Sequence, residues 1–359
     1  MSIVHITGAR PNFPKLGPVY TALAARGVRQ TLVHTGQHYS DAMSDIFFTQ
    51  LELPRPDVNL GVGSGTHARQ TAAVMIGLED LFLADRPSLV VVYGDVNSTV
   101  AAALVAAKLH IPLAHVEAGL RSFDMTMPEE VNRILTDQLA ALLLVTSEDA
   151  IEHLLREGVA KERIHFVGNP MIDTLMAQRH KFDSAASRAA HSLDGDYVVA
   201  TLHRPGNVDD EEDARAVATA LSQISDIAPV ILPLHPRGKE LLMRVGLSDA
   251  ANVRVLEPLG YVEFMSLVSG AAAVVTDSGG VQEETTILGV PCFTLRPNTE
   301  RPVTITHGTN RLVTVDVVAD LVADAVRDGR PETWPTPPLW DGRAGERIAD
   351  VITTWLANR

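Results

Sequence analysis

The chain has 359 residues, of which 46% are hydrophobic and only 5% aromatic, and its formal net charge is −14. This length suggests two domains, and a core rich in Ala, Val, Leu and Ile suits helices packed on parallel strands. The negative charge argues against nucleic acid or an anionic membrane as a partner. The single cysteine, Cys292, excludes an internal disulfide and favours the cytoplasm, and neither a signal peptide nor a membrane span is expected.

Short apolar runs alternate with longer helical patterns through the first half of the chain. The runs predict buried strands, and the segments between them predict helices. Pro18 is placed in the first turns of the first helix, and Pro128 starts a later one. The predicted strands are 2–8, 30–36, 88–95, 111–119, 142–147 and 164–170. The predicted helices are 14–27, 40–51, 67–86, 97–110, 128–140 and 148–158.

The same alternation restarts in the second half. Such alternation indicates βαβ units and parallel sheets, so the predicted class is α/β with two doubly wound domains around a cleft. The polar, Ala- and Ser-rich segment from Asp173 to Asp196 is the predicted connection. The predicted strands are 196–207, 229–236, 253–260, 272–280, 290–296 and 310–316. The predicted helices are 210–224, 238–246, 261–270, 281–289, 318–329 and 345–359.

The stretch "DSGGVQEE", residues 277–284, joins a predicted strand to a predicted helix. In doubly wound sheets, ligands bind beyond the carboxyl ends of the strands. Ser278, Gly279 and Gly280 would let backbone N–H groups at a helix start hold a phosphate, and Glu284 could accept hydrogen bonds from ribose hydroxyls. A tight turn with a serine cap is the simpler alternative. The stretch is neither the G-x-G-x-x-G fingerprint nor a P-loop, so the chemistry of those motifs is not supported.

Basic side chains also follow the predicted strands. They are Arg10, Lys15, His203, Arg204, His235, Arg237 and Arg301. If both sheets face one cleft, these residues would converge into a pocket for a diphosphate. Scattered surface cations are the alternative, which fits Arg237 and Lys239 better than Arg10 and His203, because the latter two terminate apolar strands.

Three carboxylates form a second group. Asp95 and Glu117 each end an apolar strand, and Glu129 lies in the first turn of the helix that begins at Pro128. Such a set suits acid–base chemistry, but a carboxylate at a helix start also stabilises the helix dipole, so Glu129 alone could be a cap. Asp124 is assigned to a solvated loop. The sequence has no metal-ligand spacing and no G-x-S-x-G elbow, so neither a metal nor a serine nucleophile is expected.

These motifs together resemble the non-hydrolysing UDP-N-acetylglucosamine 2-epimerases over nearly the whole chain. The matching stretches run in order from "GARPNFPK", "TGQH", "GDVNST", "HVEAGLRS" and "PEEVNR" to "VGNPMIDTL", "TLHRPGNVD", "DSGGVQEE" and "TERPVTITHGTNRLV". The resemblance implies two Rossmann-like domains in the glycosyltransferase-B arrangement. The expected ranges are 1–175 for the first domain, 176–342 for the UDP-binding domain, and 343–359 for a helix that packs back on the first.

The resemblance also implies the reaction and the site. Enzymes of this family, typically homodimers without cofactors, interconvert UDP-N-acetylglucosamine and UDP-N-acetylmannosamine by eliminating UDP to a 2-acetamidoglucal and adding it back. Asp95, Glu117 and Glu129 become the acid–base candidates, Arg133 would pair with Glu129 and position it, and His203 would assist departure of the diphosphate. The positions implied to bind UDP are Arg10, Lys15, His235, Phe264, Ser278, Gly279, Gly280, Glu284 and Arg301.

Two departures from the family pattern are visible. The family usually reads His-Arg-x-Glu-Asn, whereas this chain reads "HRPGN" with Gly206, which leaves the exact UDP-sugar open. The stretch "TGQHYSDAM" lacks residues that some bacterial members use for allosteric activation, so such activation is not expected. The alternatives are a hydrolysing epimerase, a UDP-sugar glycosyltransferase of the same fold, and a nucleotide-sugar-binding regulator. The regulator would be expected to lose the three carboxylates, which this chain retains.

Overall fold

The computed structural model describes residues 2–36, 50–208, 210–234 and 236–359. The chain forms two compact units: a first unit of residues 1–177 with 338–359, and a second unit of residues 178–337. Each is a parallel sheet with helices, so the predicted α/β class with two Rossmann-like parts is confirmed. The helix predicted at 40–51 lies almost entirely outside the described residues. Among the described residues, no helix is long and apolar enough to cross a membrane.

The first unit is built on a seven-stranded parallel sheet in the order β3-β2-β1-β4-β5-β6-β7. The strand order reverses between β1 and β4, which makes their carboxyl ends the switch point where doubly wound sheets bind ligands. The central strands are buried on both faces, as their predominantly apolar sequences predict. The strands are β1 (Ser2–Thr7), β2 (Arg29–His34), β3 (Val58–Asn59), β4 (Leu89–Tyr93), β5 (Leu113–Ala118), β6 (Leu142–Val145) and β7 (Ile164–Phe166).

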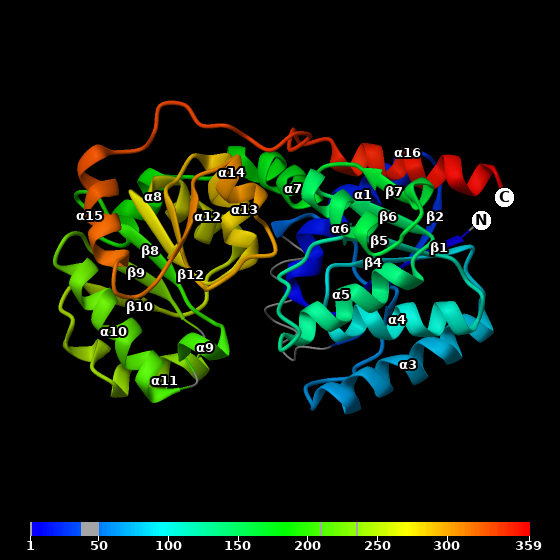
Figure 1. Ribbon diagram of the computed structural model, residues 1–359, viewed down its shortest axis with the longest axis horizontal. Helices are drawn as coiled ribbons and strands as arrows, with labels where there is room; N and C mark the ends of the chain where they lie inside the picture. Colours follow the sequence, from blue (N-terminus) through cyan, green and yellow to red (C-terminus); the bar gives the residue numbers. More distant parts are fainter. Residues whose placement is uncertain (1, 37–49, 209, 235) are drawn as a thin grey trace. The chain divides into compact units, whose positions relative to one another are not determined.

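Helices cover both faces of this sheet. Helices α3, α4 and α5 pack side by side on one face, and α1 lies with α16 on the other (Figure 1). The helices are α1 (Phe13–Ala25), α3 (His67–Ala84), α4 (Asn97–Lys108), α5 (Pro128–Leu139), α6 (Glu148–Arg156), α7 (Pro170–Gln178) and α16 (Ala344–Ala357). The predicted connection is largely helical, since α7 and then α8 (Ser184–Ala190) occupy it.

Pro18 lies inside α1 and removes one hydrogen bond of that helix. A proline nitrogen has no hydrogen to donate to the carbonyl four residues earlier, which here belongs to Pro14. The Thr174 hydroxyl of α7 donates to the Pro14 oxygen at 2.6 Å and satisfies it. A side chain distant in sequence therefore lets the helix tolerate this proline.

The C-terminal helix α16 belongs to the first unit. Asp173 of α7 accepts hydrogen bonds from the backbone N–H groups of Ala344 (3.1 Å) and Gly345 (2.7 Å) at the start of α16. A Cβ atom at Gly345 would lie 2.7 Å from the Pro18 carbonyl oxygen, so glycine is required for α16 to pack closely on α1. The chain thus returns to its first unit after completing the second.

The second unit contains a six-stranded parallel sheet in the order β10-β9-β8-β11-β12-β13, with its switch point between β8 and β11. The strands are β8 (Val198–Thr201), β9 (Val230–Pro233), β10 (Val253–Leu256), β11 (Ala273–Thr276), β12 (Cys292–Leu295) and β13 (Asn310–Val313). The remaining helices are α9 (Pro205–Val208), α10 (Glu211–Ser225), α11 (Pro236–Arg244), α12 (Tyr261–Gly270), α13 (Gly279–Leu288), α14 (Val303–Thr306) and α15 (Val318–Asp328).

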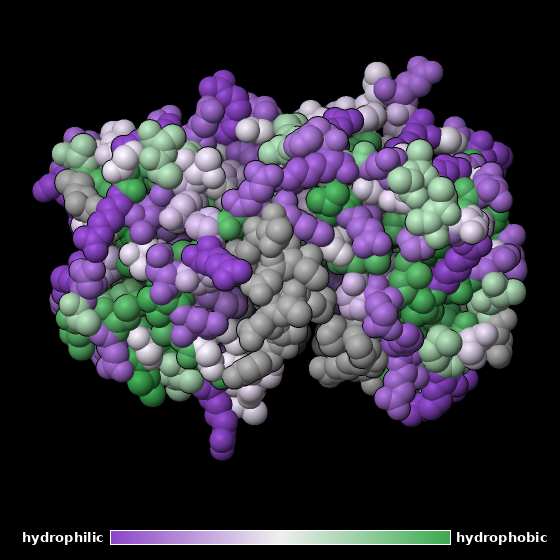
Figure 2. Space-filling view, turned by 180° about the vertical axis from the view of Figure 1, so that it is seen from behind, coloured by the Kyte–Doolittle hydropathy of each residue, from purple (hydrophilic) through white to green (hydrophobic). Residues whose placement is uncertain are grey.

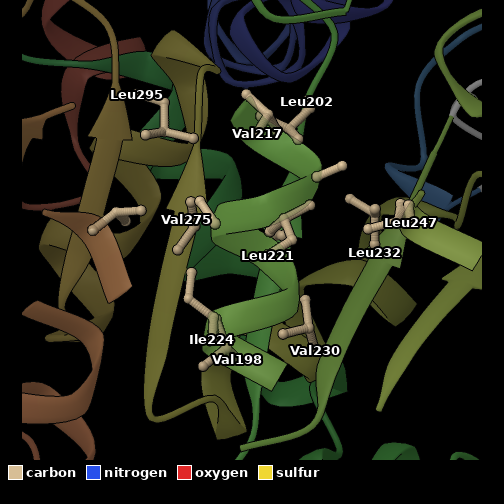
Figure 3. Close-up of a cluster of buried hydrophobic side chains, with 14 of the residues drawn as sticks. Val198, Leu202, Val217, Leu221, Ile224, Val230, Leu232, Leu247, Val275 and Leu295 are labelled. Atoms are coloured by element: carbon tan, nitrogen blue, oxygen red, sulfur yellow. The ribbon is translucent and has the colours of Figure 1, made fainter. Parts of the chain in front are cut away.

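The core of the second unit lies between its sheet and α10. Val217, Leu221 and Ile224, which are spaced at three and four residues, turn one face of α10 toward the strands (Figure 3). They pack against Val230 of β9 and Val275 of β11, both fully buried. This packing fixes the strand ends from which the polar residues of the second unit project.

Candidate active site

In the first unit, Asn12 ties the loop after β1 to the end of β4. Its Oδ1 accepts hydrogen bonds from the backbone N–H groups of Gly8 and Ala9, both at 3.0 Å, and its Nδ2 donates to the Tyr93 carbonyl at 2.9 Å. This side chain closes the switch point across the two adjacent strands. Asn12 directly precedes α1, and the buried Lys15 lies in the first turn of that helix.

A buried ion pair between Lys15 and Glu117 occupies this switch point, where their side chains are only 6% and 3% exposed. A Cβ atom at Gly94 would lie 3.1 Å from both the Lys15 Nζ and a Glu117 oxygen, so glycine leaves room for the pair. Lys15, assigned to UDP from the sequence, is thus held by a carboxylate of its own unit. Burying two charges costs several kcal/mol per ion, which their close contact offsets.

Glu117 has a strained backbone. Its φ is +72°, in the left-handed region, and the register of β5 with β6 shifts between Val116 and Ala118. For a residue other than glycine this conformation costs about 1 to 3 kcal/mol and persists only where the surroundings enforce it. Such strain is common at functional sites, which supports the selection of this carboxylate.

Arg133 joins two carboxylates near the same strand ends. One guanidinium nitrogen donates to Asp95, which follows β4, and another donates to Glu130. Glu130 is fully buried and accepts hydrogen bonds from the Ser122 N–H and hydroxyl, both at 3.0 Å. The ion pair predicted for Glu129 is therefore made by its neighbour Glu130, because helical rotation turns Glu130 inward beneath the loop after β5.

The other two carboxylates of this loop and helix are less enclosed. Glu129 is half-buried in the first turn of α5. Asp124 accepts hydrogen bonds from the Thr126 N–H at 3.0 Å and the Thr126 hydroxyl at 2.6 Å, which close a local turn. Arg10, after β1, is also half-buried, and this burial lowers the pKa of its guanidinium.

A buried charge network behind Glu117 was missed in the sequence analysis. Asp137 of α5 pairs with His115 of β5 at 2.7 Å and with Arg121 at 2.7 Å, and Arg121 makes a bidentate pair with Glu157. Burial opposes ionisation of Asp137, but its contacts with His115 and Arg121 outweigh burial and lower its pKa. The available signals were a histidine inside an apolar strand and an aspartate on the buried face of α5.

In the second unit, Asp277 at the end of β11 fixes the loop after β8. It accepts hydrogen bonds from the His203 N–H (3.0 Å), the Arg204 N–H (2.9 Å) and the Asn207 side chain (3.0 Å), and it contacts the His203 Nδ1 at 2.8 Å. Burial opposes ionisation, but His203, Asn207 and the Arg204 N–H lower the pKa of Asp277. The exposed His203 ring is therefore oriented with its Nε2 directed away from Asp277.

Ser278 directly precedes α13, whose first residues are Gly279 and Gly280, and its side chain makes no capping hydrogen bond. A Cβ atom at Gly279 would lie 2.5 Å from the Arg301 guanidinium, so only glycine allows this approach. Arg301 pairs with Glu300 at 2.5 Å and lies 2.9 Å from Glu283. The start of a ten-residue helix and a buried arginine thus lie together, as a site for an anion requires.

Glu284 lies one turn into α13, 3% exposed, and its Oε1 accepts no hydrogen bond from the described residues. Burial raises its pKa to about 8; the neighbouring Tyr261 hydroxyl opposes this shift, and Glu283 adds to it. Phe264 lies half-buried on α12, one turn from Tyr261. His235, also assigned to UDP binding, lies outside the described residues.

Comparisons with known proteins place the chain in a family. The sequence model of the family described as UDP-N-acetylglucosamine 2-epimerase matches residues 21–353. A UDP-N-acetylglucosamine 2-epimerase of Methanocaldococcus jannaschii is 42% identical, with 98% of this chain and 99% of that protein covered. A UDP-2,3-diacetamido-2,3-dideoxy-D-glucuronate 2-epimerase of Pseudomonas aeruginosa is 41% identical, with the same coverage.

Solved structures agree with these relatives. The crystal structure of the Methanocaldococcus jannaschii UDP-GlcNAc 2-epimerase in complex with UDP-GlcNAc and UDP is 42% identical, with a TM-score of 0.90 over 99% of this chain and all of that one. The structure of the Neisseria meningitidis UDP-GlcNAc 2-epimerase bound to UDP-GlcNAc is 26% identical, with a TM-score of 0.86 over all of both chains.

The fold and the polar strand ends define an α/β protein with two Rossmann-like units. Sequence and structural comparisons then narrow this class to one kind of enzyme, an isomerase. The chain belongs to the UDP-N-acetylglucosamine 2-epimerase family. The family predicted from the sequence motifs is thus confirmed.

The raised pKa of Glu284 predicts how the stability of the protein without UDP depends on pH. Because its folded pKa of about 8 exceeds the unfolded value of 4.5, its contribution to stability is fully present below pH 4.5 and is lost as the pH rises to about 8. Glu284→Gln should remove this loss, which is about 5 kcal/mol for a pKa raised from 4.5 to about 8. The measurement is the difference in urea unfolding free energy between wild type and variant at pH 5 and pH 8.5; a pH-independent difference would contradict the prediction.

Proposed function

We propose that this enzyme inverts carbon 2 of UDP-N-acetylglucosamine to give UDP-N-acetylmannosamine without net hydrolysis. Its membership of the family supports the reaction class, and one structural observation carries the rest. At the switch point of the first unit, Glu117 and Asp95 are each paired with a cation, Lys15 and Arg133, in separate environments. Two carboxylates held apart in this way suit the removal and return of a proton.

The second unit would hold the UDP moiety. The N-terminus of α13, with Ser278, Gly279 and Gly280, and the adjacent Arg301 would bind the diphosphate. Glu284 would accept hydrogen bonds from the ribose hydroxyls, which supply the donors that its Oε1 lacks. His203, oriented by Asp277, would donate to a diphosphate oxygen. Arg10 in the first unit and Phe264 and His235 in the second are proposed as further ligand contacts.

The reaction has two balanced halves. A carboxylate removes the proton from carbon 2 while the bond between carbon 1 and the diphosphate oxygen breaks, which gives a 2-acetamidoglucal and UDP. UDP then adds back to carbon 1, and a carboxylic acid returns a proton to carbon 2 on the opposite face. Asp95, Glu117 and Glu129 are proposed as this acid–base set, and Arg133 as the group that positions Asp95.

A second UDP-sugar is a specific alternative substrate. The Pseudomonas aeruginosa relative, a 2-epimerase named for a diacetamido-glucuronate, is about as similar to this chain as the archaeal relative is. Gly206, where the family motif has glutamate, is exposed, and a Cβ atom there would meet nothing within 4 Å. The loop after His203 therefore has open space where the family motif carries a glutamate side chain, which supports testing a sugar with a different substituent. Both UDP-sugars are accordingly substrates to test.

A homodimer is the proposed assembly. On α5, Val131, Leu135 and Leu139 recur at helical spacing and are exposed, and Leu83 is exposed on α3 in the same layer. Figure 2 shows that hydrophobic residues lie among hydrophilic ones on one face of the molecule. An apolar stripe along a surface helix is typical of a protein interface. The cytoplasmic location, suggested by the single cysteine, stays a prediction.

The reaction itself can be tested by hydrogen exchange. Incubation with UDP-N-acetylglucosamine in deuterated water should place deuterium at carbon 2 of the recovered nucleotide sugar, together with accumulation of the manno epimer. Mass spectrometry and NMR would measure both, with the diacetamido-glucuronate as a parallel substrate. Free N-acetylmannosamine would indicate the hydrolysing reaction, transfer to an added acceptor would indicate a glycosyltransferase, and no exchange with either sugar would refute the proposal.

The three carboxylates have a second, independent test. Asp95→Asn, Glu117→Gln and Glu129→Gln should each lower kcat about 10²- to 10⁴-fold, because each removes a group that exchanges a proton in the transition state. UDP affinity, measured by calorimetry, should change little, because the proposed UDP contacts lie mainly in the second unit. Wild-type kcat in all three variants would show that the acid–base groups lie elsewhere.

The assembly is testable by light scattering. Leu135→Glu should weaken dimerisation about 30-fold or more, because it places a charge on the apolar stripe of α5. Ile227→Glu, which changes a similarly exposed hydrophobic residue of the second unit (38% against 44% for Leu135), is the matched control and should leave the dimer intact. A dimer unaffected by Leu135→Glu would exclude this face as the interface.

A further inference from the structure

Asp137 contacts the chain both before and after Glu117. Its Oδ2 accepts a hydrogen bond from the Gly119 N–H at 3.1 Å, two residues after Glu117. Its Oδ1 contacts the His115 Nδ1 at 2.7 Å, two residues before Glu117. The one residue of β5 in the left-handed region therefore lies between two points that a single buried carboxylate fixes.

His115 links Asp137 to Gly94, which directly follows the neighbouring strand β4. The His115 Nε2 lies 2.8 Å from the Gly94 carbonyl oxygen, and because a carbonyl only accepts, the imidazole donates. Gly94 is the residue whose absent Cβ leaves space for Lys15 and Glu117. The other ring nitrogen, Nδ1, contacts Asp137, so the imidazole ring links Asp137 to Gly94 beside the Lys15–Glu117 ion pair.

Gly119 is held from its other side as well. Its carbonyl oxygen accepts a hydrogen bond from the His153 ring at 2.9 Å, and its φ is +79°. A Cβ atom at Gly119 would lie 2.7 Å from the Ala150 carbonyl, so this turn accepts only glycine. The backbone on the C-terminal side of Glu117 is therefore fixed in position.

We propose that Asp137, acting through His115 and Gly119, is a positioning residue that holds the Glu117 carboxylate in its catalytic orientation. This inference rests on the proposed function, in which Glu117 takes part in proton transfer at carbon 2. Asp137 and His115 are both fully buried and lie behind the reacting groups, so neither touches the sugar. Arg121 pairs with Asp137 and with Glu157, and no described hydrogen bond joins Arg121 or Glu157 to Gly94 or Gly119.

The chemical reason is that the rate of proton transfer depends strongly on the position of the reacting groups. A reacting group displaced by about 1 Å from its productive position loses rate on the order of 10²-fold. Without the hydrogen bonds to Gly119 and His115, the strained φ of Glu117 would relax toward the extended region and withdraw its side chain from Lys15. Binding of UDP, whose proposed contacts lie mainly in the second unit, should change little.

Asp137→Asn is the decisive variant, because it keeps the side-chain volume but gives a group that cannot accept from His115, Arg121 and Gly119 together. We expect kcat for epimerisation to fall about 10- to 100-fold, with the KM for UDP-N-acetylglucosamine within about twofold of wild type. We also expect the primary isotope effect with sugar deuterated at carbon 2 to increase, because carbon–hydrogen cleavage becomes slower than the other steps. A purely structural role would not change this isotope effect.

Glu157→Gln is the matched control, since it alters the same charge network at its far end and leaves the contacts of Asp137 in place. It should lower stability while retaining kcat and the isotope effect. An Asp137→Asn enzyme with kcat within about twofold of wild type, or a Glu157→Gln enzyme with an equal loss of kcat, would overturn the proposal.

If Asp137→Asn does not fold, as judged by circular dichroism, His115→Gln decides the question by the same two criteria. It removes the link to Gly94 and keeps the link from Asp137 to Gly119, so a smaller loss of kcat with a raised isotope effect supports the proposal, and wild-type values refute it. Failure of the proposed function is distinguishable, because it would show as an absence of exchange at carbon 2 in the wild-type enzyme.

Discussion

The buried ion pair between Lys15 and Glu117 constrains the whole end of the first sheet. Two charges without water are tolerated only if their partners are fixed, so neighbouring elements must hold each of them. Asn12 sets the loop that leads to Lys15, Gly94 leaves the space, and Asp137 holds the turn on either side of Glu117. The positive φ of Glu117 is stable because these contacts act together.

The second unit uses a buried carboxylate in a related way. Asp277 gathers the loop after β8 through two backbone N–H groups, an amide and a histidine, much as Asp137 gathers groups around β5. Asp277 joins the ends of the neighbouring strands β8 and β11 directly, whereas Asp137 holds β5 and reaches the end of β4 only through His115. Each sheet thereby presents polar groups at its switch point from a rigid base, which suits sites that must keep their geometry through a reaction.

The net charge of the chain does not reveal where its positively charged side chains lie. The chain carries a net charge of −14, yet Lys15, Arg133 and Arg301 all lie buried at strand ends, each in contact with carboxylates. These pairs neutralise the interior while keeping cations beside the places where an anionic ligand is proposed to bind. The acidic surface and the basic strand ends are therefore compatible features of one enzyme for a nucleotide sugar.

The sequence by itself determined the alternation of strands and helices, the two parallel sheets and the family. Hydrophobic runs of four to six residues and helical spacing are local properties, and the described strands that they predict are all found. Among the described strands, only β3 was not predicted, because a strand of two residues is too short to show a hydrophobic period. The tertiary structure decided which carboxylate meets which cation: Arg133 with Glu130 and Asp95, Lys15 with Glu117, and His115 with Asp137. Such pairs join residues up to 102 positions apart, and they depend on strand order and backbone twist, which no local pattern in the sequence records.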